Sequence, residues 1–136
     1  MNYIEALEQY SRHLHPGFSR LAGTLERLQR VKPGWDGPKS PAISVEAMNV
    51  VARLALDVFP ADMVDLMHVA PIPNGMLQME WYSNREGLEL ELEAPDKIRY
   101  LRWAPSRGIE DEDDVPVSDT GRILELLKWF KENILQ

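Results

Sequence analysis

Apolar residues in the first part of the chain recur at the spacing of an α-helix, which predicts three amphipathic helices. We expect them at residues 2–14, about 18–31 and about 45–58. Only His15-Pro16-Gly17 interrupts the first two, so they are expected to pair as an antiparallel hairpin. Residues 32–42 are rich in proline and glycine and predict a loop, after which Ser44 is the expected N-cap of the third helix.

The middle of the chain changes to a period of two, which is typical of strands with one buried and one solvated face. Strands are expected at residues 66–70, 77–81, 88–92 and 98–103. Asn74-Gly75 predicts a hairpin turn between the first two, because both residues tolerate a positive φ. The fourth strand carries apolar residues at both parities, so the sequence leaves open which of its faces is buried.

The last part of the chain predicts a surface loop at residues 104–117 and a C-terminal helix capped by Ser118. Helices and strands are thus segregated along the sequence, which indicates an α+β fold. The expected architecture is a four-stranded antiparallel β-meander packed against the N-terminal helices and the C-terminal helix.

A length of 136 residues fits one domain, and a composition of 44% hydrophobic and 27% charged residues is typical of a globular protein. The absence of cysteine excludes disulfides, thiolate nucleophiles and cysteine-based metal sites. No apolar run approaches the roughly 18 residues that span a bilayer, and the N-terminus does not have the pattern of a signal peptide. We therefore expect a single domain over residues 1–136, in the cytoplasm and without membrane contact.

The net charge of −7 is unevenly distributed. Residues 1–58 carry seven Lys/Arg and six Asp/Glu, whereas residues 59–136 carry eight Lys/Arg and sixteen Asp/Glu. The acidic half repels nucleic-acid phosphates and anionic lipids, so direct nucleic-acid binding is not expected. The same charge is compatible with binding to a basic protein surface, including one that normally holds nucleic acid.

The most distinctive local motif is Trp35-Asp36-Gly37, inside the proline-rich loop. A tryptophan in such a loop can anchor a protein interface. A structural role is the alternative: Trp35 covers the edge of the core, Asp36 caps a turn and Gly37 supplies a positive φ. Both interpretations are open at this point.

Two segments resemble an uncharacterised family of bacterial proteins. They are Gly34-Trp35-Asp36-Gly37 with Pro41-Ala42-Ile43-Ser44 leading into a helix, and Pro71-Ile72-Pro73-Asn74-Gly75 before a strand that ends in Glu80-Trp81. The resemblance covers about residues 34–103. The family's loop commonly continues Tyr-Gly-Ala, where this chain has Pro38-Lys39-Ser40. The resemblance supports the fold and implies no catalytic residue, because the family has no known activity.

The sequence contains no pattern typical of a catalytic or metal site. His13 and His15 fall on different faces of a helix, and His68 is alone in a strand. A calcium loop starting at Asp111 would need an acceptor and a glycine where the chain has Val115 and Pro116. We therefore expect no metal, no cofactor and no catalytic residue.

The acidic run from Glu110 to Asp114, together with the glutamates of the alternating strands, predicts a negative surface. Arg99 and Arg102 of the adjoining strand are expected to neutralise part of it. The predicted partner-binding residues are Trp35, Asp36, Glu89, Glu91, Glu110, Asp111 and Asp113. The resulting hypothesis is a non-catalytic protein-binding accessory module, of bacterial or phage origin, that acts through an acidic surface.

Three alternatives stay open. A phage-encoded inhibitor of a host nucleic-acid-binding defence complex, such as a DNA-mimicking anti-CRISPR protein, fits the size and charge by analogy. An enzyme with a carboxylate site in the sheet would be favoured by a deep pocket that holds an acid with a raised pKa. A structural homodimer built by edge-strand pairing would be favoured by an exposed apolar edge or helix face.

Overall fold

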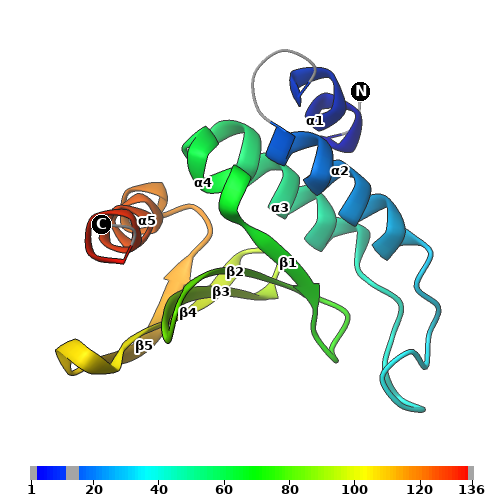
Figure 1. Ribbon diagram of the computed structural model, residues 1–136. Helices are drawn as coiled ribbons and strands as arrows, with labels where there is room; N and C mark the ends of the chain where they lie inside the picture. The colour runs from blue at the N-terminus through cyan, green and yellow to red at the C-terminus, as the bar shows by residue number, and fades with distance from the viewer. Residues whose placement is uncertain (1–2, 12–15, 135–136) are drawn as a thin grey trace.

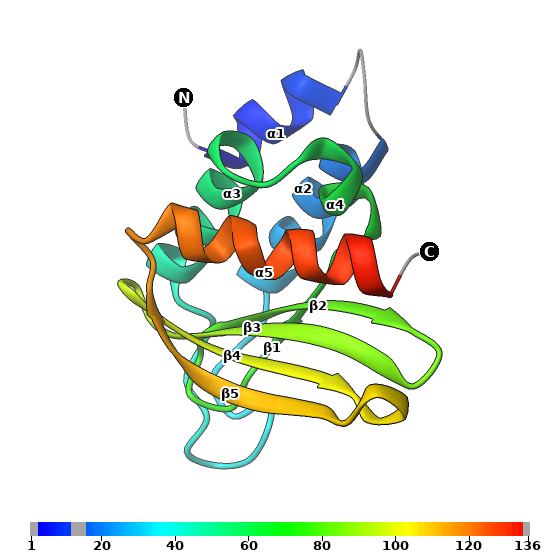
Figure 2. The same cartoon turned by 90° about the vertical axis from the view of Figure 1, so that its left-hand side faces the viewer.

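The computed structural model describes residues 3–11 and 16–134. These residues form two layers, with five helices on one side and a five-stranded antiparallel sheet on the other (Figure 1, Figure 2). The helices are α1 (Tyr3–Ser11), α2 (Pro16–Gln29), α3 (Val45–Asp57), α4 (Ala61–Leu66) and α5 (Thr120–Asn133). The strands, in both chain and sheet order, are β1 (His68–Pro71), β2 (Leu77–Ser83), β3 (Glu86–Ala94), β4 (Lys97–Ala104) and β5 (Ile109–Pro116). The prediction of an α+β fold with an antiparallel meander is confirmed.

The sheet has a fifth strand, so the prediction of four was wrong. Residues 109–116, expected in a loop, form β5, and the 3-10 turn Pro105–Arg107 with Gly108 at φ 69° reverses the chain into it. Acidic residues are poor strand formers. Cations of β4 offset their repulsion, because Arg102 contacts Asp111 at 2.6 Å and Arg99 contacts Glu112 at 3.1 Å. Pairing with a neighbouring strand thus decides the structure of this segment.

One helix and one helix cap differ from the expectation. α4 was not predicted, because six residues are too few to show a helical stripe. Because α4 extends to Leu66, the first strand begins at His68 and not at residue 66. The N-cap of α5 is Asp119 and not Ser118, since the carboxylate of Asp119 accepts a hydrogen bond from the backbone N–H of Arg122 at 3.1 Å. The cap at Ser44 is confirmed, because its hydroxyl accepts from the backbone N–H of Ala47 at 3.1 Å.

The connection between β1 and β2 is longer than a two-residue turn. Within residues 72–76, Gly75 takes a positive φ of 86°, whereas Asn74 uses its side chain to accept a hydrogen bond from the backbone N–H of Met76 at 3.0 Å. A Cβ on Gly75 would lie 2.8 Å from the carbonyl oxygen of Ala42. The backbone N–H of Ser44 also donates to the carbonyl of Gly75 at 2.8 Å. These contacts tie the long loop before α3 to this end of the sheet.

The inner face of the sheet, which the helices cover, is apolar. Its fully buried residues on β2 and β3 are Leu77, Met79, Trp81, Leu88, Leu90 and Leu92. On β4, Ile98 lies opposite Leu92 and Tyr100 lies opposite Leu90, so both face the helices. Leu101 and Trp103 therefore point to the other side, which settles the face that the sequence left open.

Trp81 joins the sheet to the helical layer. Its indole N–H donates to the carbonyl oxygen of Met63 at 2.8 Å, and its ring meets Phe59 edge-on at a centroid distance of 5.6 Å. The side chain is completely buried. A single residue thus combines core packing with a buried hydrogen bond to α4.

We expect Trp81→Phe to lower the free energy of unfolding by about 2–4 kcal/mol, because it opens a cavity and leaves the Met63 carbonyl without its donor. Urea unfolding measures the loss. Trp35→Phe is the matched control, since it removes a half-buried indole that donates to the carbonyl of Pro41, and it should cost about 1 kcal/mol. Equal losses in the two variants would contradict the role assigned to Trp81.

Candidate functional site

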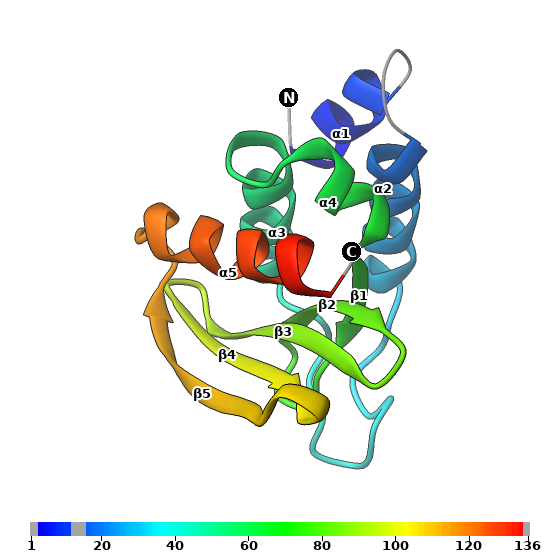
Figure 3. The same ribbon diagram turned by 60° about the vertical axis from the view of Figure 1, so that its left-hand side comes forward.

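The side of the sheet that faces away from the helices, which we call the outer face, is not covered by any described helix (Figure 3). The antiparallel register arranges its side chains in rows that cross the strands. Three of these rows, one aromatic and two charged, make up the candidate site.

The first row contains Tyr82 on β2, Gly87 on β3, Trp103 on β4 and Glu110 on β5. The rings of Tyr82 and Trp103 touch across the strand between them, with centroids 5.6 Å apart and planes inclined by 53°. A Cβ on Gly87 would lie 2.4 Å from Cζ2 of Trp103, so the indole lies directly on the backbone of β3. Tyr82 is 47% exposed. We call Tyr82, Gly87 and Trp103 the aromatic platform.

The second row contains Glu80, Glu89, Leu101 and Glu112. Glu80 and Glu89 lie directly opposite each other, which places two like charges at the closest cross-strand distance. Burial raises the pKa of the Glu89 carboxyl, and the charges of Glu80 and Glu91 raise it further. The hydroxyl of Tyr82 donates to Glu89 at 3.2 Å and opposes this shift. Burial and both neighbouring carboxylates raise the pKa of the Tyr82 phenol.

The third row contains Gln78, Glu91, Arg99 and Asp114, and it lies near the cations of the outer face. Arg99 pairs with Glu112 at 3.1 Å and with Asp114 at 3.4 Å. Lys97 pairs with Glu93 at 3.3 Å and with Asp114 at 3.5 Å. Both cations therefore form ion pairs with carboxylates at this end of the sheet, and none of these ion pairs involves the carboxylates next to the aromatic platform, Glu89 and Glu110.

The outer face carries seven carboxylates and two cations among the described residues of β2 to β5, a net charge of −5. The carboxylates are Glu80, Glu89, Glu91, Glu93, Glu110, Glu112 and Asp114. Four of them, Glu80, Glu89, Glu91 and Glu110, form no ion pair in the part of the chain that the structure describes. Glu110 lies in the same row as the aromatic platform, Glu80 and Glu89 lie in the next row, and Glu91 lies in the row beyond it.

Three of the predicted acidic residues, Glu89, Glu91 and Glu110, lie together on this face. Glu80, Glu112 and Asp114, which belong to the predicted negative surface but not to the predicted partner-binding set, also lie on this face. The prediction missed the two aromatic residues, Tyr82 and Trp103, because their contact depends on the register across Gly87.

Asp111 and Asp113 lie on the opposite parity of β5, toward the helices. Asp111 accepts hydrogen bonds from Nε and Nη2 of Arg102 at 2.7 and 2.6 Å, and this pairing holds the pKa of the Asp111 carboxyl below its usual value. The Arg102 guanidinium also lies 5.1 Å from the centroid of the Trp129 ring and 5.9 Å from that of Tyr100. Asp111 thus links β5 to β4, and Arg102 in turn contacts Trp129 of α5.

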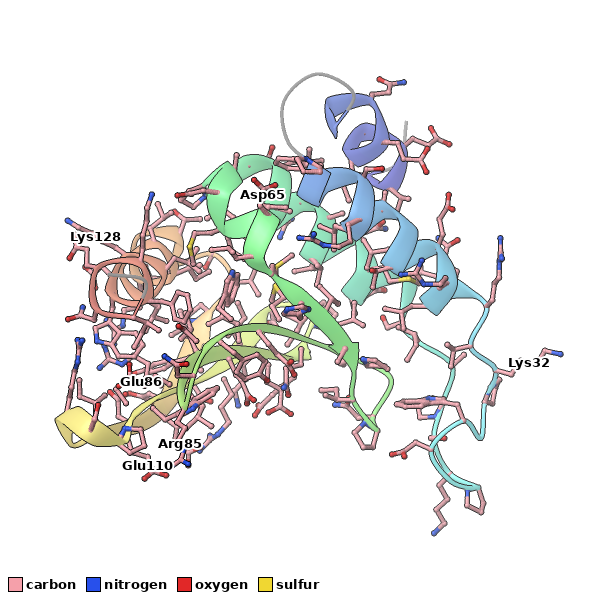
Figure 4. The ribbon with its side chains drawn as sticks, in the orientation of Figure 1. Lys32, Asp65, Arg85, Glu86, Glu110 and Lys128 are labelled. Carbon is pink, nitrogen blue, oxygen red and sulfur yellow. The ribbon has the colours of Figure 1, made fainter. Side chains whose placement is uncertain are left out.

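Trp35 and Asp36 lie at the other edge of the molecule. The loop that contains them meets the β1–β2 connection, whereas Glu110 begins the strand at the opposite edge; Figure 4 shows Lys32 of this loop far from Glu110. Trp35 is half-buried and donates to the carbonyl of Pro41 at 2.9 Å, and the backbone N–H of Asp36 donates to the hydroxyl of Ser40 at 2.9 Å. The structure therefore does not bring these two residues together with the acidic set.

Two of the hollows that described residues line lie outside the outer face. One of about 410 Å³ is lined by residues 36–40 and Pro73. Another of about 280 Å³ lies between α4 and α5, and the residues of α5 that line it are Leu124, Leu127, Lys128 and Lys131. Glu89, the described carboxyl with a raised pKa, lines neither hollow. The condition that would favour a carboxylate enzyme is therefore not met by this residue.

Within residues 3–11 and 16–134, no three acidic or histidine side chains come together as candidate metal ligands. His68 is exposed on β1, and His13 and His15 lie outside the described residues. None of the helices in the described ranges has the length and apolar character that crossing a bilayer requires.

Comparisons of the chain with protein-family models, with curated proteins and with solved structures gave no match. The resemblance of the Trp-Asp-Gly loop and the Glu-Trp strand to a bacterial family therefore stays a prediction.

We expect Asp111→Asn to destabilise the protein by about 1–2 kcal/mol at neutral pH, because it removes a charge-assisted pair that is partly screened by solvent. A carboxyl with a lowered pKa stabilises the fold above its ordinary pKa of 3.8 and loses this effect as the pH falls through its folded pKa. The difference from the wild type should therefore shrink in acid. Urea unfolding across this pH range measures it, with Asp113→Asn as the control that should be close to neutral.

Glu89→Gln should stabilise the protein at neutral pH by a few tenths of a kcal/mol, because it removes a like charge opposite Glu80. A carboxyl with a raised pKa destabilises the fold when it is ionised, and this penalty vanishes below its ordinary pKa of 4.5. The gain should therefore disappear in acid and decrease with salt. Glu26→Gln, at an exposed position on α2, is the control. A loss of stability in Glu89→Gln would show that Glu89 supports the fold.

Proposed function

We propose that this protein is a non-catalytic protein-binding module whose outer face docks on a basic surface of a protein partner. The observation that carries the proposal is the uncovered sheet face with a net charge of −5, on which four carboxylates lack an ion pair within the described residues. Complementary charge attracts and orients a partner of opposite sign.

The repulsion between neighbouring carboxylates on the outer face, which destabilises the free protein, supports the proposal. Glu89 lies opposite Glu80 and two residues from Glu91, and these neighbours raise its pKa. Like charges in such positions destabilise a sheet. A cationic partner would relieve the repulsion when it binds, so a surface that is unfavourable in the free protein becomes favourable in the complex.

The rigidity of the site also supports docking. Its charged residues lie on β2 to β5, which are hydrogen-bonded to their neighbours and backed by the buried inner face. The packed sheet fixes the backbone positions from which these side chains extend before the partner arrives, which lowers the entropic cost of association. A loop with the same composition would not have this advantage.

A basic surface that normally holds nucleic acid has the charge that the outer face requires. The more specific form of the proposal is therefore an inhibitor that occupies such a surface, as a phage-encoded protein could against a host defence complex. Its support is the charge and the size of the molecule.

The test is co-purification of partners from cells of the source organism after nuclease treatment. We expect the triple variant Glu89→Lys, Glu91→Lys, Glu110→Lys to lose a stoichiometric partner that the wild type retains, because the variant reverses the charge of the outer face. Binding of the purified partner should weaken with increasing salt. Competition with duplex DNA for that partner tests the inhibitor form.

The matched control is Glu26→Lys, Asp57→Lys, Glu132→Lys, which changes the net charge by the same amount on exposed helical positions. It should retain the partner. If both variants lose the partner equally, binding depends on the overall charge and not on the outer face. If both variants retain the partner, docking through the outer face is refuted.

A further inference from the structure

The aromatic platform is a specific feature of the outer face. Tyr82 and Trp103 come from strands that are not neighbours, and their rings meet because Gly87, on the strand between them, has no side chain. A Cβ at this glycine would lie 2.4 and 2.6 Å from two indole carbons. Both rings are on the uncovered side of the sheet, so they contribute little to the core that the helices close.

On the inner face, a guanidinium already binds between a carboxylate and an aromatic ring. There, the Arg102 guanidinium is held by the carboxylate of Asp111 and lies 5.1 Å from the centroid of the Trp129 ring. Carboxylates border the aromatic platform too: Glu89 accepts from the Tyr82 hydroxyl, and Glu110 lies opposite Trp103. The cation–π contacts of the described residues involve only Arg102 and Arg122, and neither lies over the platform.

We propose that the aromatic platform binds an arginine side chain of the partner. The guanidinium stacks on the rings of Trp103 and Tyr82, and its N–H groups donate to the carboxylates beside them. This inference rests on the proposed docking function and names the chemical group that anchors the partner.

Arginine fits this site better than lysine for three physical reasons. Its guanidinium is planar and stacks on an aromatic ring, it is less strongly hydrated than an ammonium group, and it can donate two parallel hydrogen bonds to one carboxylate. A purely electrostatic surface would not distinguish the two cations at equal charge. Selectivity for arginine is therefore the property that separates the platform from the acidic face around it.

The charges at this end of the sheet suggest where the guanidinium lies. Arg85, in the turn between β2 and β3, is at the same end of the sheet as Glu110 (Figure 4). Its positive charge disfavours a second cation next to the turn. Tyr82 is on β2, the strand that leads into this turn, whereas Trp103 is on β4, which does not contribute to it. We therefore expect the guanidinium over Trp103.

The experiment compares two synthetic peptides of equal length, one alternating arginine with serine and one alternating lysine with serine. Each is titrated into the full chain at low salt, and the indole N–H signal of Trp103 is followed by NMR. We expect the arginine peptide to bind roughly two- to fivefold more tightly, the size of a cation–π contact at an exposed site. Trp103→Leu should abolish this preference and keep salt-sensitive binding of both peptides.

Three further variants make the result specific. Tyr82→Phe keeps the ring and should keep the preference for the arginine peptide. Tyr82→Leu removes one ring but leaves the indole on Gly87, and it should reduce this preference. Trp35→Leu, at the opposite edge of the sheet, should behave as the wild type. The indole signals of Trp81 and Trp129 report whether each variant retains its fold.

Equal affinity for the two peptides in the wild type, or a preference that survives in Trp103→Leu, would overturn the inference. If both peptides bind equally and the charge-reversed outer face loses both, the docking function stands without an arginine site. Binding of neither peptide also overturns the inference, and the co-purification experiment then decides the docking function independently.

Discussion

The register of β3 is the constraint on which the rest of the structure depends. Its leucines face the helices and its glutamates face away, so a slip of one residue would bury Glu89 and Glu91 and expose the apolar side. Because β3 is the central strand, its register also fixes which residues of β2 and β4 share each face. The apolar core and the charged outer face therefore follow from the same constraint.

Features that depend on local sequence could be predicted. The alternation in β2 and β3 gave both the strands and their faces, and the cap at Ser44 follows from its position before a helical stripe. β5 could not be predicted in this way, because its carboxylates are held by Arg99 and Arg102 on another strand. The buried face of β4 was likewise decided by its neighbour and not by its own composition.

The candidate site was predictable in its charge but not in its shape. Glu89, Glu91 and Glu110 were named from their acidity, whereas the contact of Tyr82 with Trp103 exists only through the register across Gly87. The same register separates carboxylates of one acidic run into two roles: Asp111 stabilises the fold through Arg102, and Glu110 faces solvent. Trp35 is distinctive in sequence, but it is placed by contacts within its own loop.

The two edge strands of the sheet determine whether copies of this protein can pair with one another through their strands. β5 lies at one edge, and pairing it with a second β5 would bring two runs of five acidic residues, 110–114, alongside each other. β1, at the other edge, has four residues and ends in Pro71, which has no N–H to offer a new strand. Both edges therefore disfavour the addition of strands, the β5 edge as long as its carboxylates are ionised. Protected edges of this kind reduce the risk of strand-by-strand polymerisation that an exposed sheet face would otherwise carry.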